Sequence, residues 1–216
     1  MATNLLRSAI LALSLFGIVS DIRAEQTEAS HSRYVQAIWH LQQLQLHFHS
    51  FHNRYACDAL EHKITHILKA VGARSDVAVS AGCMRGQFLS GAQVNIDVAF
   101  PVAATADNID RATTFNARER LVGRVRNTAL PTPADLERFG ASWENVSLTR
   151  DRQLRLTTAD CELIAALNKQ VFPQMAVQLD TRSFNCPSVA TRVRPRVEVA
   201  ALLASPVIPI ARNDRL

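Results

Sequence analysis

Residues 39–57 read WHLQQLQLHFHSFHNRYAC, and residues 143–161 read WENVSLTRDRQLRLTTADC. Each stretch begins at one of the chain's two tryptophans and ends, 18 residues later, at a cysteine. An offset of 104 residues superposes the two stretches, and an offset of 103 superposes the next cysteines, Cys83 and Cys186. Self-similarity at a fixed spacing is typical of repeated structural units. The sequence therefore predicts two copies of one unit.

Each copy shows the same predicted order of elements: strand, helix, strand, strand. Apolar residues recur at helical spacing over 60–71 in the first copy and over 163–171 in the second. Gly72 and Pro173 follow these runs as signals for the end of a helix. Alternating apolar residues predict the strands, at 44–48, 77–81 and 94–98 in the first copy and at 146–156, 176–179 and 197–201 in the second.

The predicted fold class is α+β, with two tandem β-α-β-β units that share one pseudo-symmetric sheet or face each other as one body. The first unit is expected over residues 25–103, and the second unit with a C-terminal tail over 142–216. Between them, residues 104–141 form a connector. Its apolar and arginine pattern, followed by Pro131 and Pro133, predicts short helices and not a flexible linker.

Residues 1–24 have the features of a secretory signal peptide. Residues 1–7 carry a positive charge, residues 8–19 form an apolar run, and Ala24 precedes a candidate cleavage site. The run of 12 apolar residues is shorter than the ~20 needed to span a bilayer. We expect a periplasmic or secreted protein, with no membrane span in the mature chain.

All four cysteines lie in the predicted mature chain, and an even number in an oxidising compartment favours two disulfides. Zinc ligands usually lie two to four residues apart, whereas the spacings here are 26 and 25 residues. Pairing Cys57 with Cys83 and Cys161 with Cys186 is preferred, because these cysteines are nearest along the chain. Pairing across the two copies would also respect the repeat.

The seven histidines all fall within residues 31–66. His47 and His49 share one face of a predicted strand, and His62 and His66 share one face of a predicted helix. Two imidazoles from each element are a ligand set for zinc or copper. The alternative is that all four are solvated, because the strand and the helix meet through their opposite, apolar faces. No other cofactor is predicted.

Charge is distributed unequally along the chain. Residues 25–110 hold 6 basic and 8 acidic residues, whereas residues 111–216 hold 16 basic and 10 acidic ones. A basic surface of this kind attracts the phosphates of lipopolysaccharide, nucleic acid or anionic lipid, although a solvated face is the commoner explanation. Aromatic residues are only 6% of the chain, so specific nucleic-acid binding is not predicted. Two groups of arginines stand out, three at alternate positions of a predicted strand and four in the connector: Arg192, Arg194, Arg196, Arg118, Arg120, Arg124 and Arg126.

Residues 55–61 (YACDALE), 71–74 (VGAR) and 160–163 (DCEL), with a tryptophan upstream of each first cysteine, resemble a group of exported proteobacterial proteins with two such repeats. The resemblance covers most of the predicted mature chain and implies export. It carries no assigned activity, and therefore no catalytic residue.

The sequence contains no Gly-x-Ser-x-Gly motif, phosphate-binding glycine loop, dinucleotide fingerprint or haem-attachment motif. Asp58, Glu61, Asp160 and Glu162 begin the predicted helices, where negative charge is favourable without any catalytic role. We expect a non-enzymatic binding or assembly module of the cell envelope, whose partner is an envelope protein or a polyanionic surface. The alternatives are a periplasmic zinc- or copper-binding protein that uses the histidines, and an enzyme of unrecognised type.

Overall fold

The computed structural model describes residues 34–205 except 85, 183 and 188–193. All of these belong to one unit, Ser32–Leu216. The predicted signal peptide and Arg192 lie outside the described residues. Helices and strands both occur throughout this part of the chain, which confirms the mixed α and β class. None of its helices has the length and hydropathy required to span a bilayer.

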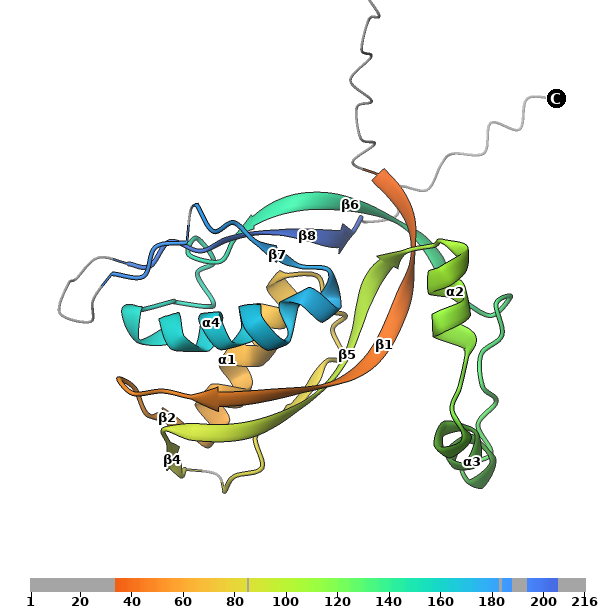
Figure 1. Cartoon of the computed structure of the whole chain (residues 1–216), viewed down its shortest axis with the longest axis horizontal. Helices are drawn as coiled ribbons and strands as arrows, with labels where there is room; N and C mark the ends of the chain where they lie inside the picture. The colour runs from red at the N-terminus through yellow and green to blue at the C-terminus, as the bar shows by residue number, and fades with distance from the viewer. Residues whose placement is uncertain (1–33, 85, 183, 188–193, 206–216) are drawn as a thin grey trace, which may run out of the picture. The chain divides into compact units, whose positions relative to one another are not determined.

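Six strands form one antiparallel sheet in the order β3-β5-β1-β6-β8-β7 (Figure 1). A separate two-stranded sheet pairs β2 (Tyr55–Ala56) with β4 (Phe88–Leu89). The strands of the large sheet are β1 (Tyr34–His49), β3 (Ala78–Ser80), β5 (Gly91–Ala103), β6 (Arg138–Ser147), β7 (Gln178–Leu179) and β8 (Glu198–Ala204).

At the centre of the large sheet, β1 and β6 pair over only five residues. The pairing runs from Tyr34 opposite Ser142 to Ile38 opposite Arg138, with Gln36 opposite Gly140 in the middle. Beyond it, β1 continues along β5 and β6 continues along β8. The two central strands therefore diverge, and each leaves an edge that no other described strand pairs with.

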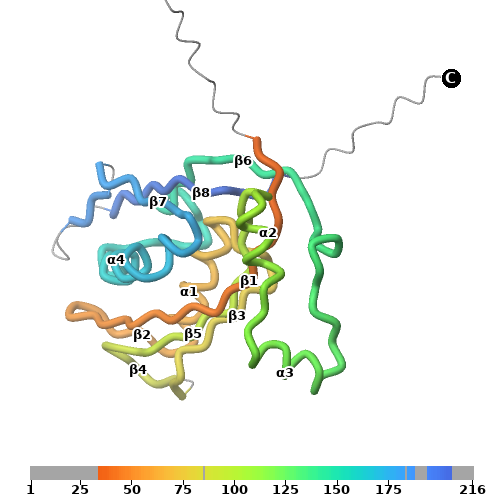
Figure 2. The backbone as a smooth tube through the Cα atoms, turned by 45° about the vertical axis from the view of Figure 1, so that its right-hand side comes forward, coloured from red at the N-terminus to blue at the C-terminus, as the bar shows by residue number. Residues whose placement is uncertain are grey.

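Two helices cover one face of the sheet, α1 (Cys57–Ala70) and α4 (Cys161–Gln170). Figures 1 and 2 show both helices between the β1–β5 part and the β6–β8 part of the sheet. One continuous hydrophobic core joins the buried side chains of both helices and both parts of the sheet. The fully buried leucines and isoleucines of these helices are Leu60, Ile64, Ile67, Leu68, Leu163, Ile164 and Leu167. Both helices lie where the apolar periodicity predicts them.

Gly72 ends α1 in a backbone conformation that favours glycine, with φ of +100°. A Cβ atom at this position would lie 2.6 Å from the carbonyl oxygen of Leu202 in β8. The stop signal seen in the sequence therefore also marks a close approach between the end of α1 and the sheet. At the end of α4, a short 3₁₀ helix (Phe172–Met175) with Pro173 in its first turn follows directly.

Both disulfides have the preferred pairing, Cys57 with Cys83 and Cys161 with Cys186. In each pair the first cysteine is the first residue of a helix, and the second lies in the segment between two later strands. Each disulfide therefore fastens the start of a helix to the sheet that it covers.

The first strand predicted for the second half is wrong beyond residue 147. β6 ends at Ser147, and the following residues form turns before the 3₁₀ helix Thr158–Asp160. The carboxylate of Asp151 accepts hydrogen bonds from the N–H groups of Gln153 and Leu154, which stabilises a turn in place of a strand. The leucines that produced the alternating pattern, Leu148, Leu154 and Leu156, are buried in the core all the same.

Residues 104–137 connect β5 to β6. They contain α2 (Ala106–Thr113) and α3 (Ala117–Val125). β6 begins at Arg138, inside the range expected for the connector. Figures 1 and 2 show that α2 lies beside the sheet and that α3 lies farther from it.

Candidate functional site

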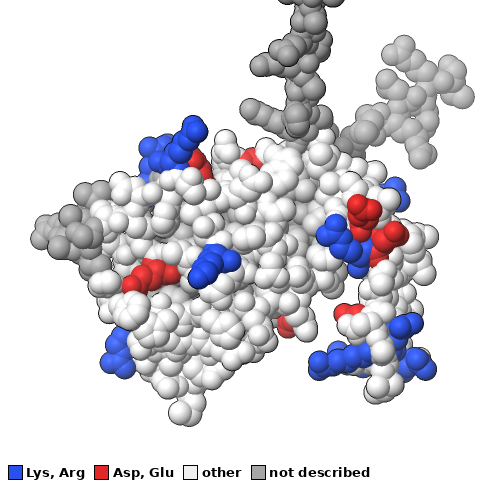
Figure 3. All heavy atoms as spheres, in the orientation of Figure 1, with Lys and Arg blue, Asp and Glu red and all other residues white. Residues whose placement is uncertain are grey.

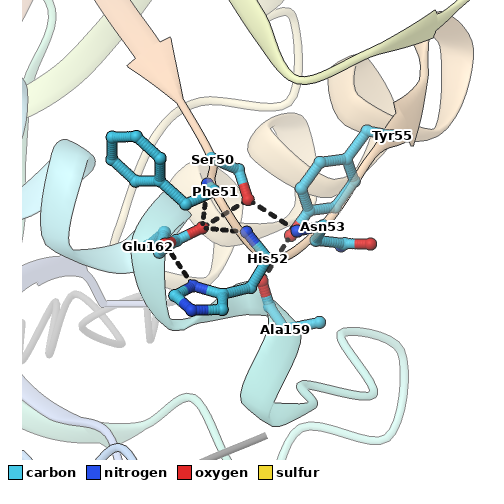
Figure 4. Close-up of polar contacts among 7 residues, drawn as sticks. All are labelled: Ser50, Phe51, His52, Asn53, Tyr55, Ala159 and Glu162. Atoms are coloured by element: carbon cyan, nitrogen blue, oxygen red, sulfur yellow. Dashed lines mark hydrogen bonds and ion pairs between the residues drawn. The ribbon is translucent and has the colours of Figure 1, made fainter.

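The side chain of Glu162 joins the start of α4 to the loop between β1 and β2 (Figure 4). Its Oε2 accepts hydrogen bonds from the Ser50 hydroxyl and from the N–H groups of Phe51 (3.1 Å) and His52 (3.4 Å). Its Oε1 lies 2.8 Å from Nδ1 of the His52 imidazole. The hydroxyl oxygen of Ser50 accepts a further hydrogen bond from the N–H of Asn53. One carboxylate thus fixes the whole loop.

Burial alone would raise the pKa of Glu162. Hydrogen bonds from the Ser50 hydroxyl, the His52 imidazole and two backbone N–H groups outweigh burial, so the pKa of this carboxyl is lowered. Glu162 is therefore ionised at neutral pH and forms an ion pair with His52 whenever the imidazole is protonated.

A second carboxylate, Asp160, lies directly before α4 and is only 1% exposed. Its Oδ1 accepts hydrogen bonds from the Tyr55 hydroxyl (2.7 Å) and from Nζ of Lys63 (2.8 Å). Its Oδ2 accepts from the N–H and the hydroxyl of Thr157. Burial, followed by the nearby charge of Asp160, raises the pKa of Tyr55. Asp160 thus connects the start of α4 to β2 and to α1.

Ser50, His52 and Glu162 are the residue types of a hydrolase triad, but they are connected differently. In a triad the imidazole lies between the serine and the carboxylate and accepts the serine proton. Here the hydroxyl and the imidazole both contact the carboxylate, and Ser50 is buried. This cluster is therefore arranged to join chain segments and not to activate Ser50.

The edge of β1 that diverges from β6 is covered by side chains from α4 and the residues after it. The Gln170 amide accepts from the N–H of His47 (2.8 Å) and donates to its carbonyl oxygen (2.9 Å). Two such bonds to one residue are what a neighbouring antiparallel strand would supply. Next to them, the Gln42 amide donates to Gln174 at 3.2 Å. The end of α4 therefore takes the place of a strand at this edge.

The diverging edge of β6 borders an open hollow with a volume of about 450 Å³. Its one carboxylate, Glu144, accepts a 2.8 Å hydrogen bond from the Ser142 hydroxyl. Ser142 is buried, and the lining holds no imidazole that could accept the proton of its hydroxyl, so the hollow resembles a binding surface more than a catalytic site. Its lining residues are Tyr34, Ser142, Trp143, Glu144, Asn145 and Ala200.

The four histidines proposed as metal ligands do not converge. His47 and His49 are exposed on the face of β1 opposite the core. His62 and His66 lie on α1 with ring centroids 5.3 Å apart, and α1 packs against the core face. Among the described residues, the group of three donors close enough to share an ion is formed by Glu61 and two cysteines that are already disulfide-bonded.

The strand predicted to carry the anion-binding arginines is described in part. Arg194 and Arg196 lie before β8, which begins at Glu198, so they are not in a strand; Arg196 forms only an isolated β-bridge, to Asn185. Arg194 and Arg196 are both exposed on either side of buried Pro195, as the alternation predicts. Arg196 forms an ion pair with Glu198 at 3.2 Å. Of the four connector arginines singled out in the sequence, Arg118, Arg120 and Arg124 lie on α3, and Arg126 directly follows it. Every residue of α3 except Gly123 is exposed.

No family model, curated protein or solved structure matches this chain. The roles of its residues are therefore assigned from geometry and chemistry.

Sequence reasoning placed Asp160 and Glu162 at a helix start but missed their partners. Asp160 makes no side-chain hydrogen bond that caps α4, and both carboxylates bind residues about a hundred positions earlier in the chain. The sequence contained a partial indication of a polar site, because the two acids lie on either side of Cys161 at the start of the helix. Nothing in the local pattern pointed to Ser50 or Tyr55.

Proposed function

We propose that this chain is an exported, disulfide-stabilised binding module of the cell envelope, built from two copies of one β-α-β-β unit. The copies supply matching strands to one sheet and one helix each to its covered face: β1, β3, β5 and α1 from the first, and β6, β7, β8 and α4 from the second. In both copies the disulfide joins the helix start to the segment between the last two strands that the copy supplies to the large sheet.

The register between the central strands supports the duplication. Gln36 lies opposite Gly140, and these positions differ by 104, the offset that superposes the two tryptophans. Two positions to one side of this pair, Tyr34 lies opposite Ser142. Two positions to the other side, Ile38 lies opposite Arg138. Two copies related by a twofold axis through the Gln36–Gly140 pair would produce this arrangement.

Export is supported by the chemistry of the cysteines. Both disulfides are typical of proteins outside the reducing cytoplasm. Residues 1–24 match the pattern of a signal peptide. Membership of the exported proteobacterial group remains a prediction from the motifs around the cysteines.

The binding role rests on one observation: α3 exposes aliphatic side chains and arginines that the fold does not use. Leu121 and Val125 are 58% and 78% exposed, whereas most of the leucines and valines that the structure describes are buried. An exposed apolar surface with a polar rim is typical of an interaction site. The carboxylates of Asp160 and Glu162, in contrast, are already hydrogen-bonded to other residues of the chain. A zinc or copper role has less support, because the two histidine pairs lie on opposite sides of the sheet.

The test is to produce the tagged chain in a Gram-negative host, separate its compartments and probe its thiols with a maleimide. We expect a chain shortened by about 24 residues in the periplasmic fraction, with no thiol labelled before reduction. A full-length cytoplasmic chain with four reactive thiols would contradict export.

Binding is tested by sedimenting the purified chain with isolated cell envelopes over a range of concentrations. Saturable co-sedimentation supports the binding role. Absence of any saturable binding to envelopes would overturn it, whatever the compartment of the chain.

A further inference from the structure

The helix α3 packs its glycine side against the loop that follows it and leaves its aliphatic side exposed. Gly123 is the one buried residue of α3, and a Cβ atom there would lie 3.2 Å from the carbonyl oxygen of Thr128. Leu121 and Val125 are two positions before and after Gly123, so they lie about 160° around the helix from it. Val122, about 100° from Gly123 on the flank of the helix, is 40% exposed. A helix that served only the fold would have the opposite orientation.

The segment that carries α3 is held by local interactions. Asn116 and Glu119 form a reciprocal capping box at the start of α3, with hydrogen bonds of 2.8 and 2.9 Å. The loop after α3 is closed by the Thr132–Asp135 contacts. Within the described part of the chain, no side-chain hydrogen bond or ion pair joins residues 114–137 to another segment. The exposed aliphatic residues of α3 therefore do not stabilise the sheet.

Four arginines surround the exposed aliphatic residues of α3, and none forms an ion pair with a described residue. The one acid of the helix, Glu119, is engaged in the capping box. In Figure 3 lysine and arginine atoms gather over the position that α3 has in Figure 1. The arginines are Arg118, Arg120, Arg124 and Arg126.

We infer that α3 is the contact through which the chain lies on an anionic lipid bilayer. This inference rests on the proposed binding function and names its partner. Aliphatic side chains that enter the interface, flanked by arginines that bind lipid phosphates, form the recognised pattern of an interfacial helix. A second copy of this chain is a poor occupant, because it would bring arginines against arginines. Nucleic acid is also a poor one, since α3 offers no aromatic ring for base stacking.

The experiment measures co-sedimentation of the chain, freed of residues 1–24 by export or truncation, with vesicles. One set contains phosphatidylcholine alone, and the other contains phosphatidylcholine with phosphatidylglycerol. Two variants alter the proposed contact: Leu121→Ser with Val125→Ser, and Arg120→Gln with Arg124→Gln. Because all four residues are exposed, circular dichroism and thermal unfolding should match those of the wild type.

Two matched controls carry the same chemical changes elsewhere. Arg150→Gln with Arg152→Gln removes two exposed arginines from a turn, and Leu41→Ser removes a leucine that is 69% exposed on β1. We expect the wild type and both controls to bind the anionic vesicles within about twofold of one another. Each α3 variant should bind at least tenfold more weakly, and added salt should weaken wild-type binding.

Equal binding by the α3 variants and the wild type would overturn the inference. So would wild-type binding to isolated envelopes without binding to anionic vesicles, which would leave the proposed binding function intact and point to an acidic envelope protein. Absence of binding to vesicles and envelopes alike would overturn both proposals.

Discussion

The hydroxyl of Tyr55 donates a 2.7 Å hydrogen bond to the carboxylate of Asp160, 105 positions later in the chain. Lys63 binds the same oxygen at 2.8 Å, so the second half of the chain places one buried charge against two donors from the first half. A buried carboxylate is tolerated only when it is paired and hydrogen-bonded. This contact therefore makes the two halves depend on each other.

Asp160→Asn should destabilise the chain, because it removes the charge that Lys63 is paired with in a buried setting. We expect a loss of about 2–3 kcal/mol, seen as a fall of about 5–10 °C in the melting temperature. Asp135→Asn is a matched control, since Asp135 accepts the same pair of hydrogen bonds from a threonine three residues earlier but is exposed. The control should melt close to the wild type. Equal effects of the two substitutions would contradict the role of the Asp160 contact.

Glu162 should make the stability of the chain depend on pH on the acid side. Its pKa is lowered in the folded state, so its contribution is present above the ordinary glutamate pKa and is lost as the pH falls through the lowered value. The melting temperatures of the wild type and Glu162→Gln should differ most near neutral pH. They should converge in acid, where the wild-type carboxyl is also neutral. Glu144→Gln removes one negative charge from another glutamate and therefore reports the general effect of net charge. If the difference in melting temperature between the wild type and Glu162→Gln stays constant with pH, this account is wrong.

Gly72→Ala should be strongly destabilising for two independent reasons. The backbone has a φ of +100°, and the new methyl group would lie 2.6 Å from the carbonyl oxygen of Leu202. We expect a loss of about 2–4 kcal/mol in the free energy of unfolding, measured by denaturant titration. Gly140→Ala is the control, since a Cβ atom there meets nothing within 4 Å, and it should change stability by less than about 0.5 kcal/mol. Similar losses at both positions would mean that the close approach of α1 to β8 is not the cause.

Gln170→Ala should expose the edge of β1 without disturbing the core. The amide of Gln170 satisfies both backbone groups of His47, and their loss should cost about 1–2 kcal/mol. Hydrogen exchange measured by NMR should become at least tenfold faster at the His47 amide. Gln174→Ala removes contacts to the Gln42 side chain and to the carbonyl oxygen of Gln170. Neither contact involves a backbone group of β1, so this variant should leave the exchange rate nearly unchanged. Unaltered exchange in the Gln170 variant would show that water or another group replaces the amide.

The helices, most strands and the disulfide pairing were predictable because their signals are local. Apolar spacing over 60–71 specifies the buried side of α1, and cysteines that are neighbours along the chain reach each other readily. The prediction of a strand at 154–156 was wrong because buried leucines in a turn show the same alternation as a strand. The Asp151 side chain, which stabilises that turn, outweighed the apolar pattern.

The polar contacts were not predictable, because they join residues about a hundred positions apart. Glu162 and Ser50 carry no shared motif, and their contact exists only once α4 lies beside the end of β1. The histidines illustrate the same limit. The alternation correctly placed His47 and His49 on the exposed face of β1, but whether α1 lay on that face or on the other depended on the tertiary fold.

The two disulfides join cysteines that are consecutive along the chain, the first with the second and the third with the fourth. A chain that is oxidised from its N-terminal end onward therefore reaches the native pairing simply by joining each new cysteine to the one still free. No wrong bond has to be formed and then broken, so the slow reshuffling that delays many oxidised proteins is not required. The order of the cysteines thus gives a chain oxidised from its N-terminal end a route to the native pairing that needs no disulfide isomerisation.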